Sequence, residues 1–249
     1  MSGKTYFQEI QKRIKRIEND QWDSIRTASE MIADVIERGG LIHAFGSGHT
    51  HILVEEFWCR AGGLATVSPI LDPDQMPYTG PFKGSALEKL VGFGKILFET
   101  HDADPGDLII VLSNSGRNPT PIEIARSAKE RGLTVVAITS MDYSTEVPSR
   151  DPSGKKLYEI ADLVIDNAGP LGDALIDLED SKIKAGPCST VLNAVILNVI
   201  VCEVASILIE KGIQPPIFVS ANLDVSMDHN EKLFMKYGPR IRFFDRYPG

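Results

Sequence analysis

The sequence has few cysteines, and their spacing excludes two kinds of structure. Cys59, Cys188 and Cys202 are the only three and form no CxxC pair, so neither a disulfide framework nor a cysteine-based zinc site is expected. An odd count scattered through apolar surroundings is typical of reduced, buried thiols in a cytoplasmic protein. Residues 1–16 also lack the apolar segment of a signal peptide and enter a charged helical pattern directly. We therefore expect a cytoplasmic protein.

Positive charge is also scarce. The chain has 26 Lys and Arg against 34 Asp and Glu, which gives a net charge of −8 and a pI of about 5.2. Nucleic acids and anionic membranes bind basic surfaces, so neither is expected as a partner. One apolar run, 191–209, has the length of a membrane span, but it contains Asn193, Asn198 and Glu203. Because a carboxylate at mid-bilayer costs about 3 kcal/mol, we expect a helix buried in the core or at a subunit interface.

Common cofactor and metal motifs are missing as well. No GxxxxGK[ST] segment occurs, and the Gly-x-Gly at 46–48 has His51 where a dinucleotide-binding fingerprint has its third glycine. His49-Thr50-His51 has neither an HExxH pattern nor a carboxylate set to complete a metal site. Few aromatic residues border the glycine-rich loops, which argues against a flavin. We expect no metal and no cofactor.

What the sequence does contain is an alternation of short apolar runs with helical segments. A helical segment at 5–38, interrupted near Asn19-Asp20, is followed by β-rich runs at 41–45, 64–70, 108–113, 133–139 and 163–166. This alternation predicts a parallel sheet covered by helices. We expect a single domain over 1–249, with an α/β core at about 39–212 and a C-terminal tail at 213–249.

Several helix starts are predicted from local signals. Ser85-x-x-Glu88 is a capping box for a helix over 85–100, and Thr120-x-x-Glu123 is one for a helix that ends at Arg131-Gly132. A long helix is expected from about 187–190 to Gly212, and a short one near 226–237.

Two of the predicted strands end in loops rich in glycine and hydroxyl residues. The first loop has Gly46, Ser47, Gly48, His49 and Thr50, and the loop after the third strand has Ser113, Asn114, Ser115 and Gly116. If the strand order is 2-1-3-4-5, strands 1 and 3 are neighbours and both loops line one crevice at the point where the winding reverses. Glycines allow close backbone approach, and N–H groups at a helix start attract an anion. The pair of loops predicts a site for a phosphate monoester, although each loop alone is equally consistent with an ordinary tight turn.

Five segments of the chain carry a resemblance to a known family: "HILVEEFWCRAGG", "VLSNSGRNPTPIEIA", "ITSMDYS", "GPCSTVLNAVILN" and "FVSANLDVSMDHNEKLFMKY". With them the sequence resembles sugar isomerase (SIS) domain proteins of the phosphoheptose-isomerase-like branch, over about 5–245. The Ser-x-Ser-Gly loop is the most specific shared element. The resemblance implies a flavodoxin-like three-layer α/β/α sandwich with a five-stranded sheet, forming a homodimer or tetramer and binding sugar phosphates. By position it assigns phosphosugar contacts to Ser47, Thr50, Ser113, Ser115, Thr120, Thr139 and Ser140, with Asn114 and Arg117 as sugar or rim contacts. Ser189, Thr190 and Asn193, which open the long helix, contact sugar or merely cap it.

Aldose–ketose isomerisation needs a base for the carbon-bound proton and an acid for the oxygens. Glu55, Glu56 and His49 are the candidates near the first loop, and His229 resembles the C-terminal histidine that family enzymes supply. Heptose-phosphate isomerases carry their helix glutamate a few residues further from the loop than Glu55 or Glu56. Because of this difference, binding of a sugar phosphate would not by itself make Glu55 or Glu56 the catalytic base. His43 and His101 are expected to be structural. The favoured function is a cofactor-free phosphosugar isomerase; the alternatives are a phosphosugar sensor and an amino-sugar-phosphate etherase or lyase.

Overall fold

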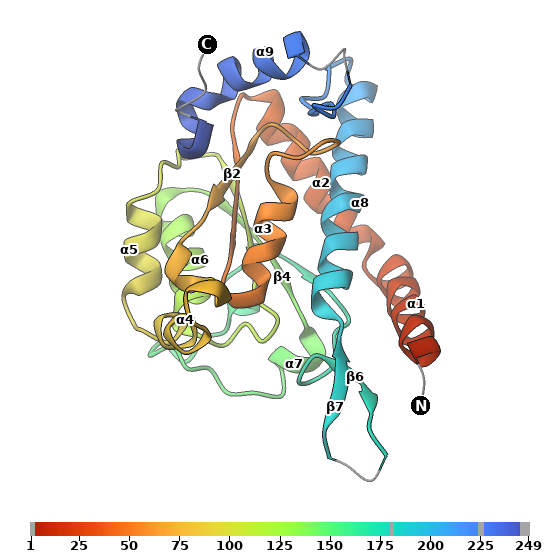
Figure 1. Ribbon diagram of the computed structural model, residues 1–249. Helices are drawn as coiled ribbons and strands as arrows, with labels where there is room; N and C mark the ends of the chain where they lie inside the picture. Colours follow the sequence, from red (N-terminus) through yellow and green to blue (C-terminus); the bar gives the residue numbers. More distant parts are fainter. Residues whose placement is uncertain (1–2, 180–181, 224–226, 245–249) are drawn as a thin grey trace.

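The computed structural model describes residues 3–179, 182–223 and 227–244, shown as a ribbon in Figure 1. The chain begins with two helices, α1 (Gly3–Asp20) and α2 (Trp22–Glu37), that meet at Gln21. The predicted interruption of the first helical segment is confirmed to within a residue or two. The buried side chains of α2 follow the isoleucine spacing seen in the sequence and include Ile25 and Ile32.

The central sheet contains five parallel strands in the predicted order. These are β1 (Ile42–Gly46), β2 (Val67–Ile70), β3 (Leu108–Leu112), β4 (Thr134–Thr139) and β5 (Leu163–Asp166), arranged β2-β1-β3-β4-β5. In the parallel register Gly46 of β1 is paired with Leu112 of β3. The two glycine- and serine-rich loops therefore start side by side at the carboxyl edge of the sheet.

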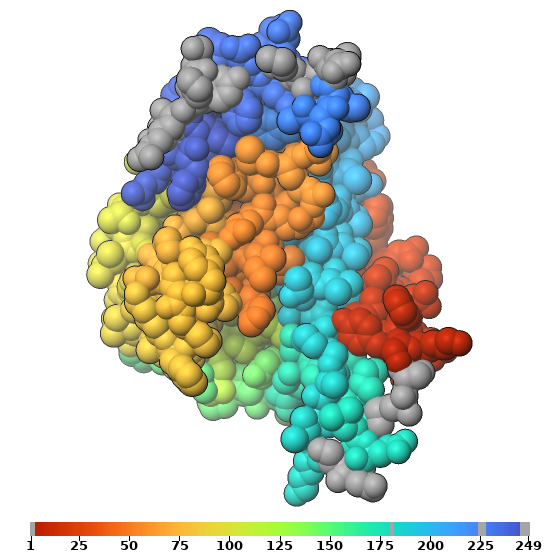
Figure 2. Space-filling view, viewed as in Figure 1, coloured from red at the N-terminus to blue at the C-terminus, as the bar shows by residue number. Residues whose placement is uncertain are grey.

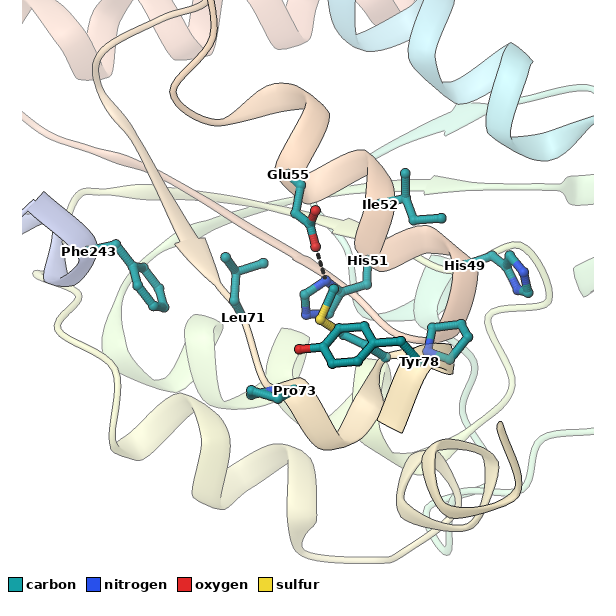
Figure 3. A pocket seen from close by; sticks show the side chains of 10 residues that line it. His49, His51, Ile52, Glu55, Leu71, Pro73, Tyr78 and Phe243 are labelled. Carbon is teal, nitrogen blue, oxygen red and sulfur yellow. Dashed lines mark ion pairs between the residues drawn. The ribbon is translucent and has the colours of Figure 1, made fainter. Parts of the chain in front are cut away.

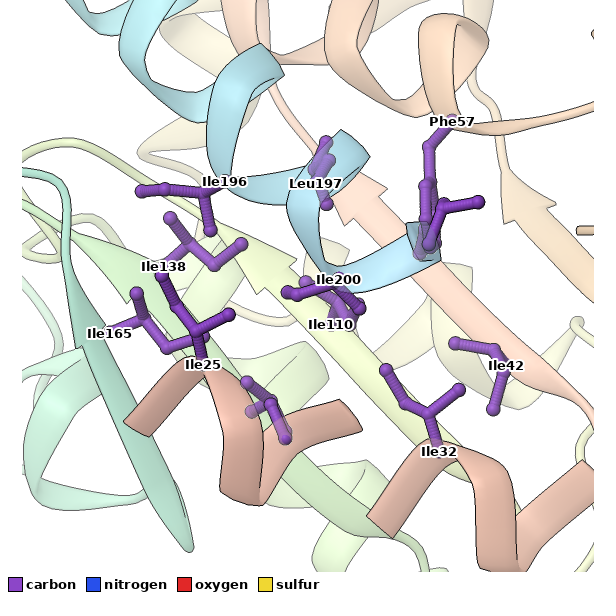
Figure 4. Packing of buried hydrophobic residues seen from close by; sticks show 14 of the residues in the cluster. Ile25, Ile32, Ile42, Phe57, Ile110, Ile138, Ile165, Ile196, Leu197 and Ile200 are labelled. Atoms are coloured by element: carbon purple, nitrogen blue, oxygen red, sulfur yellow. The ribbon is translucent and has the colours of Figure 1, made fainter. Parts of the chain in front are cut away.

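Helices cover both faces of this sheet, which makes the α/β/α sandwich. On one face, Ile42, Ile110, Ile138 and Ile165 pack against α2, α3 (His51–Phe57) and α8 (Ser189–Glu210), as Figure 4 shows. The alternate strand residues, such as Phe45 and Val111, face α5 (Phe93–Glu99) and α6 (Pro119–Arg131). Strands buried on both faces explain why the sequence runs are continuously apolar rather than alternating.

The predicted helix over 85–100 is wrong in one respect, because the chain forms two helices there. α4 (Pro81–Glu88) ends before Gly92, whose φ of 91° breaks the helix, and α5 then begins at Phe93. Neither predicted capping box exists. Ser85 lies inside α4, and Asn118 precedes α6. The Glu123 carboxylate instead accepts hydrogen bonds from Gly92 N (2.6 Å) and Gly94 N (3.0 Å), so a side chain of α6 caps the start of α5.

A β-hairpin that the sequence did not reveal, β6 (Ala174–Asp177) with β7 (Lys184–Pro187), extends beyond the body beside α1. Figure 2 shows it as the protruding cyan arm. Short elements complete the described chain: η1 (Gly48–Thr50), η2 (Pro73–Gln75), η3 (Pro77–Thr79), α7 (Met141–Ser144), η4 (Leu157–Glu159), α9 (Met227–Tyr237), η5 (Gly238–Arg240) and η6 (Arg242–Phe244). The C-terminal elements pack on Leu41 and Ala65, which precede β1 and β2, and so lie at the amino edge of the sheet.

Helix α8 is the one helix of the described residues long and apolar enough to cross a membrane, and half of its apolar stretch is buried inside the fold. It packs along α2, while Val191, Asn198, Cys202 and Ile209 remain exposed along its outer side. Cys188 is buried, but Cys59 and Cys202 are exposed, so the expectation of three buried thiols is wrong for two of them.

A buried polar cluster closes the amino edge of the sheet. His43 Nε2 donates to Asp107 Oδ2 (3.0 Å), and His43 Nδ1 lies 2.8 Å from His101 Nε2. Arg240 of the tail also donates to Asp107 Oδ2 at 2.7 Å. Burial alone would raise the pKa of Asp107, but His43 and two backbone N–H donors outweigh it and lower the pKa to about 2. Both histidines are structural here, as expected.

Replacement of Asp107 by Asn tests this cluster. A carboxyl whose pKa falls from 3.8 to about 2 on folding stabilises the protein above pH 4, by about 2 kcal/mol. The Asp107→Asn variant should show that deficit in its free energy of unfolding at pH 7, and the deficit should shrink as the pH falls through 4 towards 2. Denaturant titrations across this pH range measure it, with Asp177→Asn, an exposed carboxylate, as control. A deficit independent of pH would contradict the assignment.

Candidate functional site

The loop after β1 is a tight turn that only glycine permits at its first position. A Cβ on Gly46 would lie 2.6 Å from the Thr50 carbonyl oxygen, and Gly48 has a left-handed φ of +55°. Thr50 Oγ1 donates to Ser47 O at 2.6 Å and also lies 3.3 Å from Leu112 O, at the end of β3. The loop is thus fastened to itself and to the neighbouring strand. Its Ser47 hydroxyl donates to Glu88 Oε1 at 3.0 Å.

The loop after β3 holds its shape differently. Gly116 N donates to Ser113 Oγ at 3.3 Å, and the left-handed Gly116 packs against Thr139, Ser144 and Leu157. Ser115 is half-buried and makes no hydrogen bond with any other residue of the described ranges. The half-buried Arg117 has an Nε without a partner there too. Open donors are therefore found on this loop, immediately before α6.

Three other predicted phosphate contacts are buried behind the two loops. Thr120 Oγ1 donates to Leu87 O (3.1 Å), Thr139 Oγ1 to Asn114 O (3.3 Å), and Ser140 Oγ to Gly169 O (2.6 Å). Each hydroxyl proton is already used to tie neighbouring segments together. In this structure these residues support the site rather than face it.

A chain of asparagine side chains runs below the second loop. Asn167 Nδ2 lies 2.9 Å from both Asn114 Oδ1 and Asn193 Oδ1, while the amide nitrogens of Asn114 and Asn193 have no partner in the described chain. Asn167 was not predicted, although its position directly after the β5 run is the available signal. Ser189 is held by Asp173, with Oγ donating to Oδ2 at 2.9 Å, and Thr190 is exposed. Of the α8 candidates, Asn193 alone joins this chain.

A cavity of about 670 Å³ lies beside the first loop, between α3 and the segment that follows β2. Figure 3 shows Glu55 and His51 among the residues that line it, with the ring of Tyr78 beside His51 and Phe243 on the far side of Leu71. The His51 ring is 1% exposed, and neither of its nitrogens has a hydrogen-bond partner in the described part of the chain. Burial lowers the pKa of His51 and outweighs Glu55, whose Oε1 lies 3.3 Å from Nδ1. The cavity therefore contains a neutral imidazole with unmet hydrogen-bonding capacity.

A second, smaller cavity of about 200 Å³ shares His49 with the first and lies between the loop and α4. Gly48, Gln75 and Glu88 are among its lining residues. Neither His51, Gln75 nor Glu88 was predicted as a site residue. In the sequence His51 was visible as the residue interrupting a nucleotide motif and as part of the rejected metal stretch His49-Thr50-His51, and Glu88 only as half of a capping box.

Two predicted catalytic residues lie away from both cavities. Glu56 pairs with Arg60 one turn along the chain. His229 Nε2 lies 2.8 Å from Ile217 O, in the C-terminal segment at the amino edge of the sheet. Within 3–179, 182–223 and 227–244, no group of three or more His, Cys, Asp or Glu side chains is arranged to hold a metal ion.

Comparison with known proteins agrees with this geometry. A family model described as "SIS domain" matches residues 5–140, more than half of the chain. The chain belongs to the SIS family. This SIS protein is 44% identical over 240 residues to a UPF0309 protein of Caldanaerobacter subterraneus subsp. tengcongensis, covering 95% of this chain and 98% of the relative. A UPF0309 protein of Listeria monocytogenes is 42% identical over 228 residues, covering 92% of each.

Solved structures with the same fold include two phosphoheptose isomerases. The Neisseria gonorrhoeae enzyme matches the SIS domain with a TM-score of 0.54 at 17% identity, covering 81% of this chain and 96% of that one. The Francisella tularensis enzyme has a TM-score of 0.53 at 15% identity, covering 83% and 100%. The Vibrio vulnificus NanR protein complexed with ManNAc-6P has a TM-score of 0.51 at 13% identity, covering 96% and 69%. These likenesses confirm the fold.

Two glycine replacements test the first loop of the SIS domain. Gly46→Ala places a Cβ against backbone atoms of Thr50, so its cost should lie near the top of the roughly 1–3 kcal/mol expected for overpacking. Gly48→Ala meets open space; its left-handed strain of about 1–2 kcal/mol is partly offset by a less flexible unfolded chain, worth about 0.4–1 kcal/mol. Denaturant unfolding should rank Gly46→Ala as clearly more destabilising. Equal effects would show that the turn adjusts to a side chain.

Proposed function

We propose that this protein binds a sugar phosphate at the carboxyl edge of the sheet and isomerises it without a metal or cofactor. The observation that carries the proposal is the pairing of β1 with β3, which puts the two loops side by side at the reversal of the winding. The phosphate lies at the second loop, where the Ser115 hydroxyl and the Arg117 Nε have no hydrogen-bond partner among the described residues, just before α6. The sugar extends across Gly46–Thr50 into the cavities.

The larger cavity suits the part of the reaction that moves a proton between two oxygens of the sugar. Isomerisation moves one proton between adjacent carbons and another between the two oxygens. The His51 ring is neutral and buried, its Nε2 has no partner among the described residues, and Glu55 Oε1 lies 3.3 Å from its Nδ1, so the two are placed to serve the sugar oxygens or open its ring. His49, which lines both cavities, is placed to contact the sugar between them.

A second candidate function is a phosphosugar sensor. It is favoured by the fold shared with the NanR protein, which was solved with ManNAc-6P bound. An etherase or lyase acting on an amino-sugar phosphate would use the same proton-abstraction chemistry, and product analysis separates it from isomerisation.

We further propose a cytoplasmic homodimer in which a second copy covers the outer side of α8. Ile209 is 64% exposed and Val191 40% exposed on that helix, and a shallow apolar hollow runs between them over Val195, Val199 and Cys202. Contiguous apolar surface of this kind is typical of a protein–protein interface. The negative net charge gives neither nucleic acid nor an anionic membrane a favourable surface.

Thermal unfolding with matched ligand pairs tests the binding proposal. A sugar phosphate at about 100 times its dissociation constant adds about 2.7 kcal/mol to the free energy of unfolding, which raises the melting temperature. The parent sugars, which lack the dianion, should give little shift. The Ser115→Ala variant should weaken phosphate-dependent stabilisation, with Thr100→Ala, which removes an exposed hydroxyl after α5, as control. Equal shifts with sugars and their phosphates would rule out the phosphate loop.

The role of the larger cavity is tested by Glu55→Gln and His51→Gln. Each removes a group proposed to transfer protons to the sugar oxygens, so turnover should fall by roughly 100-fold or more while phosphate-dependent stabilisation is retained. Coupled or NMR assays of sugar-phosphate interconversion measure the rate, with Glu30→Gln, an exposed carboxylate paired with Arg26, as control. Undiminished turnover in both variants would remove this cavity from the mechanism.

A further inference from the structure

Glu88, at the end of α4, has an unusual environment for a carboxylate. Its Oε1 accepts a hydrogen bond from the neutral Ser47 hydroxyl at 3.0 Å, and no ion pair to Glu88 is found in the part of the chain that the structure describes. The adjacent Lys89 does not neutralise it, because Lys89 Nζ donates to Ser85 Oγ at 2.9 Å. The carboxylate thus faces the glycine loop, with one oxygen bound by Ser47 and the other without a partner among the described residues.

The cavity in front of Glu88 contains a second polar group that lacks a partner. Gln75 is 1% exposed, and neither its amide nitrogen nor its amide oxygen has a hydrogen-bond partner among the described residues. Both Gln75 and Glu88 line the cavity of about 200 Å³ together with Gly48. A buried amide with both a donor and an acceptor unmet matches a ligand hydroxyl, which is itself both donor and acceptor. This observation is independent of the Ser47–Glu88 contact and indicates a sugar-binding position.

The Ser47–Glu88 contact also determines which end of the ligand lies at the first loop. A phosphate dianion placed at Ser47 would have to displace Glu88 from the hydroxyl and would then be repelled by it. Among the described residues, no carboxylate is hydrogen-bonded to Ser115 in the second loop. The phosphate therefore belongs at the second loop, and the uncharged carbon chain of the sugar belongs beside Ser47 and Gly48.

Other carboxylates near the two loops are already committed. Glu55 lies against the His51 ring, Glu56 pairs with Arg60, and Glu123 accepts from two backbone N–H groups. A general base needs an ionised group with a free lone pair within reach of the reacting carbon. Glu88 lines the cavity with one oxygen not hydrogen-bonded to a described residue, and Gly48 beside it has no side chain to obstruct the approach.

We propose that Glu88 is the base that moves the carbon-bound proton of the sugar phosphate. This rests on the proposed phosphosugar site and adds the residue that breaks the C–H bond. The Glu88 carboxylate takes the proton from C2 of the aldose, and the electron pair of that C–H bond forms the C1=C2 double bond of an enediol as the carbonyl oxygen O1 takes the N–H proton of the neutral His51 ring. The glutamic acid then returns its proton to C1, while O2 gives its proton back to His51 and becomes the ketose carbonyl. Atoms and electrons balance without a co-reactant.

Solvent exchange at the carbons next to the carbonyl tests this step directly. The protein is incubated in D2O with fructose 6-phosphate, sedoheptulose 7-phosphate or N-acetylmannosamine 6-phosphate, and proton NMR follows loss of the signal of the exchangeable carbon-bound hydrogen. The same three probes are used for thermal shifts, so that binding and C–H cleavage are measured separately. Wild type should exchange at least one probe that it binds.

Glu88→Gln should slow this exchange by at least about 100-fold while the thermal shift with the same probe is retained. Glu88→Asp keeps the charge on a shorter side chain and should restore part of the rate, which a merely structural contact to Ser47 would not require. Glu30→Gln, a surface carboxylate, is the matched control and should exchange like wild type. Unfolding of each variant without ligand shows whether it is folded, and Glu88→Asp supplies the test if Glu88→Gln is not.

The outcomes separate the two proposals. Exchange at the wild-type rate in Glu88→Gln overturns the assignment of Glu88. Binding of a probe by wild type without exchange of any also overturns it, but leaves phosphosugar binding in place and favours the sensor. If no probe raises the melting temperature, the proposed phosphosugar site itself fails.

Discussion

The parallel pairing of β1 with β3 is the constraint on which the rest of the site depends. Because Gly46 is paired with Leu112, two loops separated by more than sixty residues of sequence begin at the same edge and the same height. The chain leaves β1 towards β2 on one side, and the β3 connection winds away on the other, so no crossover covers the gap between them. Thr50 Oγ1 in the first loop lies 3.3 Å from Leu112 O at the end of β3, so the same strand pairing also positions the loop. A different neighbour for β1 would separate the donors of the second loop from the cavities beside the first.

The sheet could be predicted because the strand signals are long, continuous and independent of distant partners. Runs such as LIIVLS at 108–113 are apolar throughout, as strands buried on both faces must be. The predicted capping boxes failed for the opposite reason. Glu88 and Glu123 have the spacing of reciprocal caps, yet their carboxylates reach Ser47 and the Gly92 region in other segments. Local spacing cannot distinguish these contacts from a local cap. The β6–β7 hairpin was also missed, because its two strands form a small sheet of their own and their sequence has no strong strand pattern.

The grouping of the candidate loops was more predictable than the contacts of their side chains. Hydroxyl residues after β1, β3 and β4 lie at one edge of the sheet, as the strand order predicts, but residue type does not say where a hydroxyl proton goes. Thr120, Thr139 and Ser140 use theirs on backbone carbonyls within the fold, whereas Ser115 uses none on described residues. His51 illustrates the same limit, since its importance comes from being buried without a partner beside a cavity. This burial arises where α3 packs against the segment after β2, so it cannot be predicted from the sequence around His51 alone.

Electrostatics gives the two loops different tasks. Two unit charges 4 Å apart near a protein surface interact by about 4 kcal/mol, and a phosphate dianion roughly doubles this. A dianion beside Ser47 would meet that repulsion from Glu88, whereas one beside Ser115 meets Arg117 and the amino end of α6. At the proposed site a sugar phosphate would consequently have one favourable direction across the crevice, with its charged end at β3 and its reactive carbons at β1. The register that aligns Gly46 with Leu112 brings both loops within reach of one small molecule, so the proposed binding and proton transfer would share a single structural origin.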